Sequence, residues 1–109
     1  MLTICKDWYA WNNTQPGGPS SFHLIGGIEV GNPGIDVLLT KRHPQGINPT
    51  ILMLDAGFYQ KPGMWPQVMT CASTRYDEVL SGQGPAYTSV QIFHDGTKID
   101  QIDKIDTVS

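Results

Sequence analysis

The sequence lacks any apolar run long enough to cross a membrane as a helix. Residues 50–58 form a short apolar stretch interrupted by Asp55, whereas a spanning helix needs about 20 predominantly apolar residues. The N-terminal Met-Leu-Thr-Ile-Cys-Lys-Asp-Trp also lacks the basic start, the apolar stretch and the small-residue cleavage site of a secretory signal. We therefore expect no membrane partner and a cytoplasmic protein.

Basic residues are few and scattered. The chain carries 7 lysines and arginines against 10 acidic residues, a net charge of −3, and only Lys41 and Arg42 are adjacent. A surface that binds nucleic acid needs clustered positive charge to neutralise phosphates and release counterions. Nucleic acid is therefore not an expected partner.

Residues that bind metals or carry out nucleophilic chemistry are also scarce. Cys5 and Cys71 are the only cysteines, and two cysteines in a cytosolic chain are more often buried thiols than a disulfide, so we expect thiols. The histidines His23, His43 and His94 show no metal-ligand spacing. The chain also has no nucleophile elbow, phosphate loop or dinucleotide fingerprint. We expect neither a metal nor a cofactor.

Glycine and proline, in contrast, are abundant. The 12 glycines and 8 prolines are spread without a period, which indicates many turns, and residues 12–21 form the most obvious loop. Asn32-Pro33-Gly34 predicts a type II turn that closes a hairpin between residues 29–30 and 35–40. His43-Pro44-Gln45-Gly46 predicts a type I turn, and Asp95-Gly96 predicts a type I′ hairpin turn.

The segments between these turns are short, and most are rich in β-branched or aromatic residues. They predict strands over residues 3–11, 22–30, 35–40, 51–54, 67–74, 87–94 and 97–102. Residues 51–54 are apolar at consecutive positions, which suits a central strand. The pattern predicts a single all-β domain over residues 1–109, a mostly antiparallel β-sandwich or small barrel of about seven strands.

Three local patterns leave alternatives open. Residues 73–80 are alternatively a short helix, capped by Ser73 and followed by Gly82. Gly26-Gly27 suggests a bulge or a close approach of other backbone. Ile99, Ile102 and Ile105 recur every third residue, which we interpret as a strand with a bulge near Gln101 rather than as a helical turn. In the predicted 95–96 hairpin, Ile92 faces Ile99 and Phe93 faces Lys98.

Aromatic residues are the main candidates for binding. Strand alternation places Trp8 and Trp11 on opposite faces, so a two-layer core does not bury both. Tyrosine and tryptophan are enriched at binding hot spots. We therefore predict a non-enzymatic binding or protein-interaction module that self-associates, or binds another protein, through the aromatic strand or the Trp65 loop. The candidate binding residues are Trp8, Tyr9, Trp11, Trp65 and His94.

Two other functions compete with this prediction. The first is a small hydrolase-like enzyme that uses His94 with Asp95, or Cys71 as a nucleophile with His23 or His94 as its base. The second is a barrel that encloses a small apolar ligand. Homodimer formation by edge pairing or sheet stacking is the expected form of self-association.

Overall fold

A computed structural model describes residues 2–14, 18–80 and 87–108. All of its regular structure is β, and no helix occurs in these residues. Consequently, the described residues contain no helix that is long and apolar enough to cross a membrane. The eight strands are β1 (Ile4–Asn13), β2 (Ser20–Val30), β3 (Ile35–Lys41), β4 (Ile51–Gln60), β5 (Thr70–Leu80), β6 (Ser89–His94), β7 (Thr97–Ile102) and β8 (Ile105–Val108).

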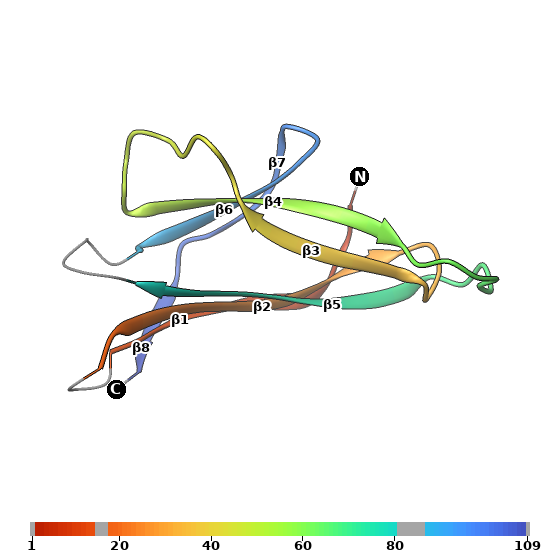
Figure 1. The fold of residues 1–109 in the computed structure, drawn as a ribbon, viewed down its shortest axis with the longest axis horizontal. Coiled ribbons are helices and arrows are strands. Elements are labelled where there is room, and N and C mark those ends of the chain that lie inside the picture. The colour runs from red at the N-terminus through yellow and green to blue at the C-terminus, as the bar shows by residue number, and fades with distance from the viewer. Residues whose placement is uncertain (1, 15–17, 81–86, 109) are drawn as a thin grey trace.

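The strands form two packed sheets. One sheet has the order β5-β2-β1-β8, and the other has the order β3-β4-β6-β7; they lie one above the other in Figure 1. The prediction of a β-sandwich is confirmed, and the barrel alternative is wrong because the sheets are separate. The sheets are mixed, since β1 pairs with β8 and β4 with β6 in parallel. Both parallel pairs join strands that are distant in the sequence, so short connections did not reveal them.

The core lies between the sheets and follows period-two alternation. In β2 the even-numbered residues from 22 to 30 are buried, and in β4 Leu52, Leu54 and Ala56 point to the same layer. The prediction that β4 is central is confirmed, because β3 and β6 flank it. The fully buried large side chains are Phe22, Leu24, Ile28, Leu52, Leu54, Val90 and Ile92.

The helical alternative for residues 73–80 is wrong, because these residues belong to β5. This strand pairs with β2 residue for residue from Thr70↔Val30 to Leu80↔Ser20. Within it Thr74 is buried and donates to the carbonyl of Val37 at 2.9 Å, whereas its neighbour Arg75 is exposed. Backbone pairing along the whole of β2 overrides the capping signals that favoured a helix.

Two of the predicted turns differ in the structure. Residues 31–34 connect β2 to β3 in the opposite sheet instead of closing a hairpin. Gly34 has no positive φ, and its N–H donates a hydrogen bond to Asn32 Oδ1 at 2.9 Å. The prediction of a type II turn is therefore wrong. The 43–46 segment contains a cis His43–Pro44 bond, and the Gly46 N–H donates to Met53 Sδ. Because this N–H bonds the Met53 sulfur and not the His43 carbonyl, the hydrogen-bonded type I turn predicted there is not formed.

The 95–96 hairpin is confirmed, with φ of 50° at Asp95 and 79° at Gly96. The register shifts by one residue between Ile92↔Asp100 and Phe93↔Lys98. The predicted Phe93 pairing is therefore correct and the Ile92 pairing is wrong. The extra residue is Ile99 rather than a position nearer Gln101.

The bulge and a change of sheet explain the period of three isoleucines. Ile102 is buried at the end of β7, and residues 103–104 then lead into β8 of the other sheet. Ile105 packs against the same core from that second sheet. The isoleucines therefore all face inward although they do not lie on one regular strand.

Cys5 and Cys71 form a disulfide, so the prediction of buried thiols is wrong. The bond links β1 to β5 beside Gly27 of β2, where a Cβ would lie 3.0 Å from Cys71 Sγ and 3.1 Å from Lys6 Cβ. Two register shifts in β1, between Ile4 and Tyr9, accompany this approach. The sequence predicted a bulge or a close approach of other backbone at Gly26-Gly27; the groups that come close to Gly27 are instead side chains, the disulfide sulfur and Lys6.

The neighbouring Gly26 makes room for Trp8 in the inner layer. A Cβ at Gly26 would lie 2.2 Å from Trp8 Cε3. The indole Nε1 of Trp8 donates to Asp100 of β7 at 2.8 Å, so the ring joins the two sheets. Two consecutive glycines in β2 therefore serve different neighbours on its two faces.

Removing the disulfide should destabilise the fold strongly. The bond closes a loop with a sequence separation of 66, for which chain-entropy arguments give roughly 4 kcal/mol. We expect a Cys5→Ser/Cys71→Ser variant, and wild type in reductant, to show similarly lowered urea midpoints. A midpoint that is unchanged in both samples would contradict the cross-link.

A methyl group at Gly26 should also be costly. Gly26→Ala forces the Trp8 ring to shift, and overpacking of this kind costs about 1–3 kcal/mol. Gly31→Ala is the matched control, because a Cβ there meets nothing within 4 Å. Thermal unfolding should show a clear loss for Gly26→Ala and almost none for Gly31→Ala. Equal losses would show that Trp8 does not occupy this space.

Candidate functional site

Connected polar side chains lie on the face of the β5-β2-β1-β8 sheet that points away from the core, here called the outer face. Strand register aligns its residues in rows across the sheet. His23 pairs with Asp77 on one side and Trp11 on the other, and Trp11 pairs with Asp106 of β8. Asp77, His23, Trp11 and Asp106 thus form one continuous row across four strands.

An aromatic stack occupies the middle of the outer face. The Trp11 ring lies between Tyr9, at a centroid distance of 5.1 Å, and His23, at 5.0 Å, with interplanar angles of 24° and 26°. Trp11 therefore contacts both neighbouring rings, and of these three residues Tyr9 is the one exposed to solvent. The stack fixes the plane of the His23 imidazole.

His23 also joins a chain of hydrogen bonds across β2 and β5. Its Nε2 lies 2.8 Å from Ser21 Oγ, and its Nδ1 lies 2.6 Å from Asp77 Oδ1. Ser21 and His23 share a face because they are two residues apart in one strand. A carboxylate only accepts hydrogen bonds, so Nδ1 carries the proton and Nε2 accepts from the serine hydroxyl in the neutral imidazole.

Arg75 fixes the third member of this chain. Its Nε donates to both carboxylate oxygens of Asp77, at 3.0 and 2.8 Å. The Arg75 guanidinium, together with the smaller contribution of His23, holds the pKa of Asp77 below its usual range despite some desolvation. Asp77 is therefore a carboxylate at neutral pH. Its side chain is 46% exposed, and that of His23 is 19% exposed.

A groove of about 520 Å³ continues the outer face toward the disulfide. Ile25 and Arg75, the neighbours of His23 and Asp77 along their strands, line it at one end. Lys6 lines it at the other end and donates to Ser73. Gly27, on the same face, adds no side chain that would fill the groove.

Of the predicted binding residues, the structure brings only Tyr9 and Trp11 together. Trp8 is on the opposite, inner face, as strand alternation predicted, and its contacts with Gly26 and Asp100 are structural. Three residues of the outer face were not predicted as binding residues, namely Ser21, His23 and Asp77. The Ser21-x-His23 spacing is a signal for a shared face, but nothing in the sequence assigned Asp77 to the adjacent strand.

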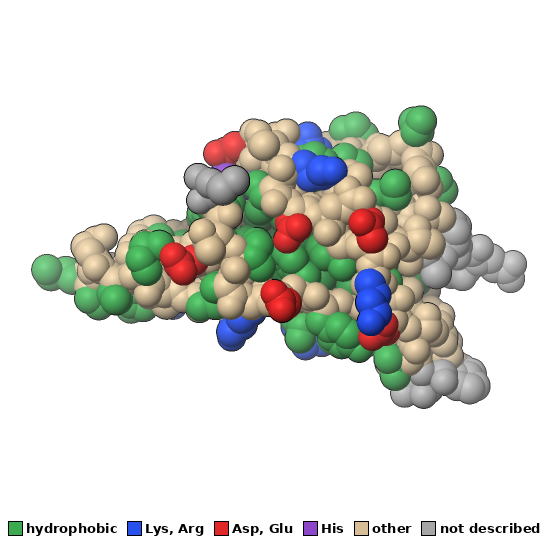
Figure 2. Space-filling view, turned by 180° about the vertical axis from the view of Figure 1, so that it is seen from behind, with side chains coloured by type: hydrophobic (Ala, Val, Ile, Leu, Met, Phe, Trp, Pro, Cys, Tyr) green, Lys and Arg blue, Asp and Glu red, His purple; other side chains and the backbone are tan. Residues whose placement is uncertain are grey.

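Trp65 lies at the far end of the molecule and anchors the segment between β4 and β5. Its Nε1 donates to the Lys61 carbonyl at 3.0 Å, and a Cβ at Gly34 would lie 2.4 Å from its ring. The surrounding Met64, Val68 and Met69 are exposed, and hydrophobic side chains gather at this protruding end in Figure 2. Trp65 therefore holds the loop, and its neighbours form the exposed surface.

His94 lies apart from the outer face, in the other sheet. Its Nδ1 is 3.0 Å from the Ala56 carbonyl, its Nε2 is 3.3 Å from Asp95 Oδ2, and its ring stacks on Phe58. The predicted contact with Asp95 is thus formed, although that carboxylate is 90% exposed. Cys71 is not a nucleophile, because its sulfur is held in the disulfide.

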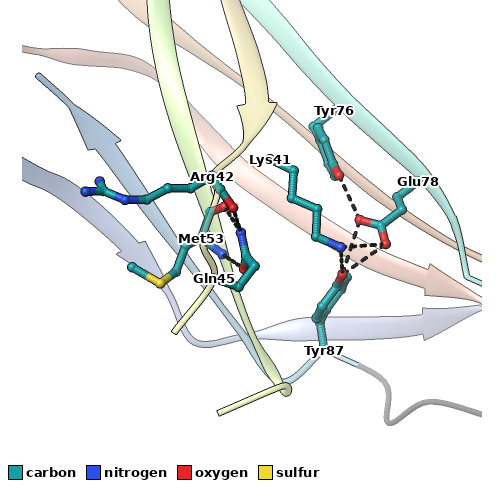
Figure 3. A network of polar contacts seen from close by, with 7 residues as sticks. All are labelled: Lys41, Arg42, Gln45, Met53, Tyr76, Glu78 and Tyr87. Atoms are coloured by element: carbon teal, nitrogen blue, oxygen red, sulfur yellow. Dashed lines mark hydrogen bonds and ion pairs between the residues drawn. The ribbon is translucent and has the colours of Figure 1, made fainter. Parts of the chain in front are cut away.

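A second polar cluster joins the two sheets at one end of the sandwich. Glu78 of β5 accepts hydrogen bonds from Tyr76 at 2.7 Å, from Tyr87 at 3.0 Å and from Lys41 at 3.3 Å; Figure 3 shows the three donors converging on this carboxylate. Close by, Gln45 bonds the backbone of Arg42 and Met53. The cluster holds together β3, β5 and the segment just before β6.

The pKa of each donor in the Glu78 cluster is raised in the folded protein. Burial, with help from Glu78, raises the pKa of Tyr76 and of Tyr87. Desolvation alone would lower the pKa of Lys41, but the contacts with Tyr87 and Glu78 raise it overall. All three groups therefore keep their protons in the folded state to higher pH than in the unfolded chain.

No protein-family model, curated protein or solved structure matches this chain. Among residues 2–14, 18–80 and 87–108, no group of three or more His, Cys, Asp or Glu side chains is placed to hold a metal ion. The chemistry of the outer face must therefore be inferred from its own geometry.

The cluster around Glu78 should make the fold sensitive to alkali. Above pH 10, tyrosines ionise in the unfolded chain while Tyr76 and Tyr87 remain protonated in the folded one, so stability falls as pH rises. Urea midpoints measured from pH 7 to 11 should fall above pH 10. Tyr76→Phe should fall less steeply, whereas Tyr59→Phe, at an exposed position, should follow wild type. Identical profiles for all three proteins would contradict this assignment.

Proposed function

We propose that the protein is an interaction module that self-associates through the open edge of β5. This strand has 11 residues and ends its sheet, and its partner there is β2. In the described part of the chain no other strand pairs with it. A long unpaired edge is a template for pairing with another chain.

β3 lies close to β5 but contacts it from the inner face. The contacts come from inward-pointing side chains, with Thr74 bonded to the Val37 carbonyl and Glu78 paired with Lys41. Figure 1 shows the C-terminal end of β3 above β5 and the start of β3 close to β5. No backbone pairing joins β3 to β5 in the described residues, so the backbone groups of β5 that point away from β2 have no strand partner there, and we propose that a second copy extends the sheet at this edge.

The charge pattern of β5 favours a second copy as the partner. In an antiparallel strand pair, the side chains of directly opposed residues point to the same side of the sheet. A two-fold axis between two copies of β5 must therefore pass beside a residue that lies opposite its own copy. An axis at Arg75 or at Asp77 would place like charges opposite each other. An axis at Tyr76 places each Arg75 opposite the partner's Asp77, twice. The proposal rests on this observation: the sequence Arg75-Tyr76-Asp77 lies on a strand whose outer edge has no strand partner in the described residues.

The same register suits the rest of the strand. It places Ala72 opposite the partner's Leu80, and Ser73 opposite the partner's Val79, which is an exposed apolar side chain. Opposite charges directly across a strand pair contribute about 0.2–1 kcal/mol each, and like charges destabilise. Two symmetric pairs therefore select the register, while backbone hydrogen bonds supply most of the association.

The disulfide bears on where this association takes place. Disulfides persist in oxidising compartments and are rare in the cytosol. The Cys5–Cys71 bond therefore favours an oxidising environment over the cytoplasmic location expected from the sequence. Self-association should therefore be measured with disulfide-bonded protein produced in an oxidising compartment of the expression host.

Charge reversal tests the register directly. Arg75→Asp and Asp77→Arg each place like charges opposite one another in the homodimer and should raise its dissociation constant roughly 30-fold, about 2 kcal/mol over two pairs. Mixing the two variants restores opposite charges only between different chains. Light scattering after size exclusion should therefore show monomers for each variant alone and heterodimers for the mixture.

Lys98→Asp is the matched control, because it reverses an exposed charge on β7, at the opposite edge of the other sheet from β3, and should leave the dimer unchanged. Circular dichroism verifies that each variant folds. A wild-type protein that remains monomeric at high concentration, or a mixture that forms no heterodimer, would refute the proposal.

A further inference from the structure

We propose that Ser21, His23 and Asp77 form a nucleophilic site for carboxylic esters on the outer face. The proposal does not require self-association, because pairing at the β5 edge leaves the outer face open, although Arg75 and Asp77 take part in both. It rests on three side chains whose order is that of nucleophile, base and orienting carboxylate.

The distances satisfy this chemistry without rearrangement. The 2.8 Å contact joins the serine hydroxyl to the imidazole nitrogen that is free to accept its proton, and the 2.6 Å contact joins the other nitrogen to a carboxylate. Two of the three members are also fixed from outside the chain of contacts, because Trp11 stacks on His23 and Arg75 binds both oxygens of Asp77. Preorganisation of this kind distinguishes a reactive site from a passing contact.

The reaction that follows is acyl transfer to water. Ser21 Oγ bonds to the ester carbonyl carbon while its proton passes to His23 Nε2, and the carbonyl oxygen becomes an oxyanion. The carbon–oxygen bond to the alcohol then breaks, and the imidazolium returns the proton to the leaving alkoxide. Water, deprotonated by His23, cleaves the acyl-serine and releases the carboxylic acid and the free hydroxyl.

Neighbouring residues supply parts that such a reaction uses. Asn13 of β1 lies directly opposite Ser21 in the register, so its side chain is on the same face, and we assign its amide as the candidate oxyanion donor. The groove that begins at Ile25 and Arg75 can receive the rest of a substrate. Asp77 does not touch the substrate and acts as a positioning residue.

A fluorophosphonate probe tests the site without knowledge of the natural ester. An activated serine displaces fluoride from phosphorus, and the serine proton is taken by the base, leaving a phosphonylated residue. Intact mass and peptide mapping should find one adduct, at Ser21. Ser21→Ala should abolish it, and His23→Gln should slow it roughly 10²–10⁴-fold, the range for loss of a general base.

Two further variants separate a reactive site from a structural one. Ser89→Ala, a serine of the other sheet that is bonded to Asp103, should leave labelling unchanged. Asp77→Asn should slow labelling and alter its pH profile, because the imidazole loses the carboxylate that sets its tautomer. The rate at which these variants hydrolyse a short p-nitrophenyl ester should follow the same order as their rates of labelling.

Absence of labelling in folded wild-type protein would overturn the proposal, as would labelling that is independent of His23. In either case the three residues would be a cross-strand hydrogen-bond chain. Ser21→Ala and His23→Gln leave Arg75 and Asp77 in place, so a dimer that persists in both variants shows that failure here does not concern self-association.

Discussion

The absence of side chains at two consecutive positions in β2 is the constraint on which the rest of the structure depends. Gly26 admits the Trp8 ring on the inner face, and Gly27 admits the Cys5–Cys71 disulfide on the outer face. Trp8 then reaches Asp100 in the other sheet. Gly26 and Gly27 together therefore fix the positions of β1 and β5, which pair with β2, and of β7 in the other sheet.

This anchoring determines what the outer face can do. Because β1 and β5 are tied to β2, their side chains form aligned rows, and Trp11, His23 and Asp77 are held in contact by pairing rather than by a flexible loop. Sites on paired strands are positioned more precisely than sites on loops. The same alignment places Arg75 and Asp77 at the sheet edge, so one strand contributes both to the polar chain and to the proposed interface.

Local chemistry was sufficient to predict the fold class and some of the turns. Asp95-Gly96 tolerates positive φ at both positions, and that hairpin forms as predicted. The type II turn predicted at Asn32-Pro33-Gly34 is not formed. Trp65, which is distant in the sequence, packs against Gly34, so this close approach and not a positive φ explains the glycine. Strand alternation separated Trp8 from Trp11 correctly, but the partners of each ring come from other strands. The disulfide and Asp77 were beyond prediction because both depend on the placement of β5 beside β2.

Amide hydrogen exchange along β5 tests the central claim, that this edge pairs with a second copy, most directly. At concentrations that favour the dimer, alternate amides of residues 72–80, those directed to the open edge, should become protected, and they should exchange faster on dilution while the amides bonded to β2 stay protected. Exchange of these edge amides that is equally fast at every concentration would contradict the pairing.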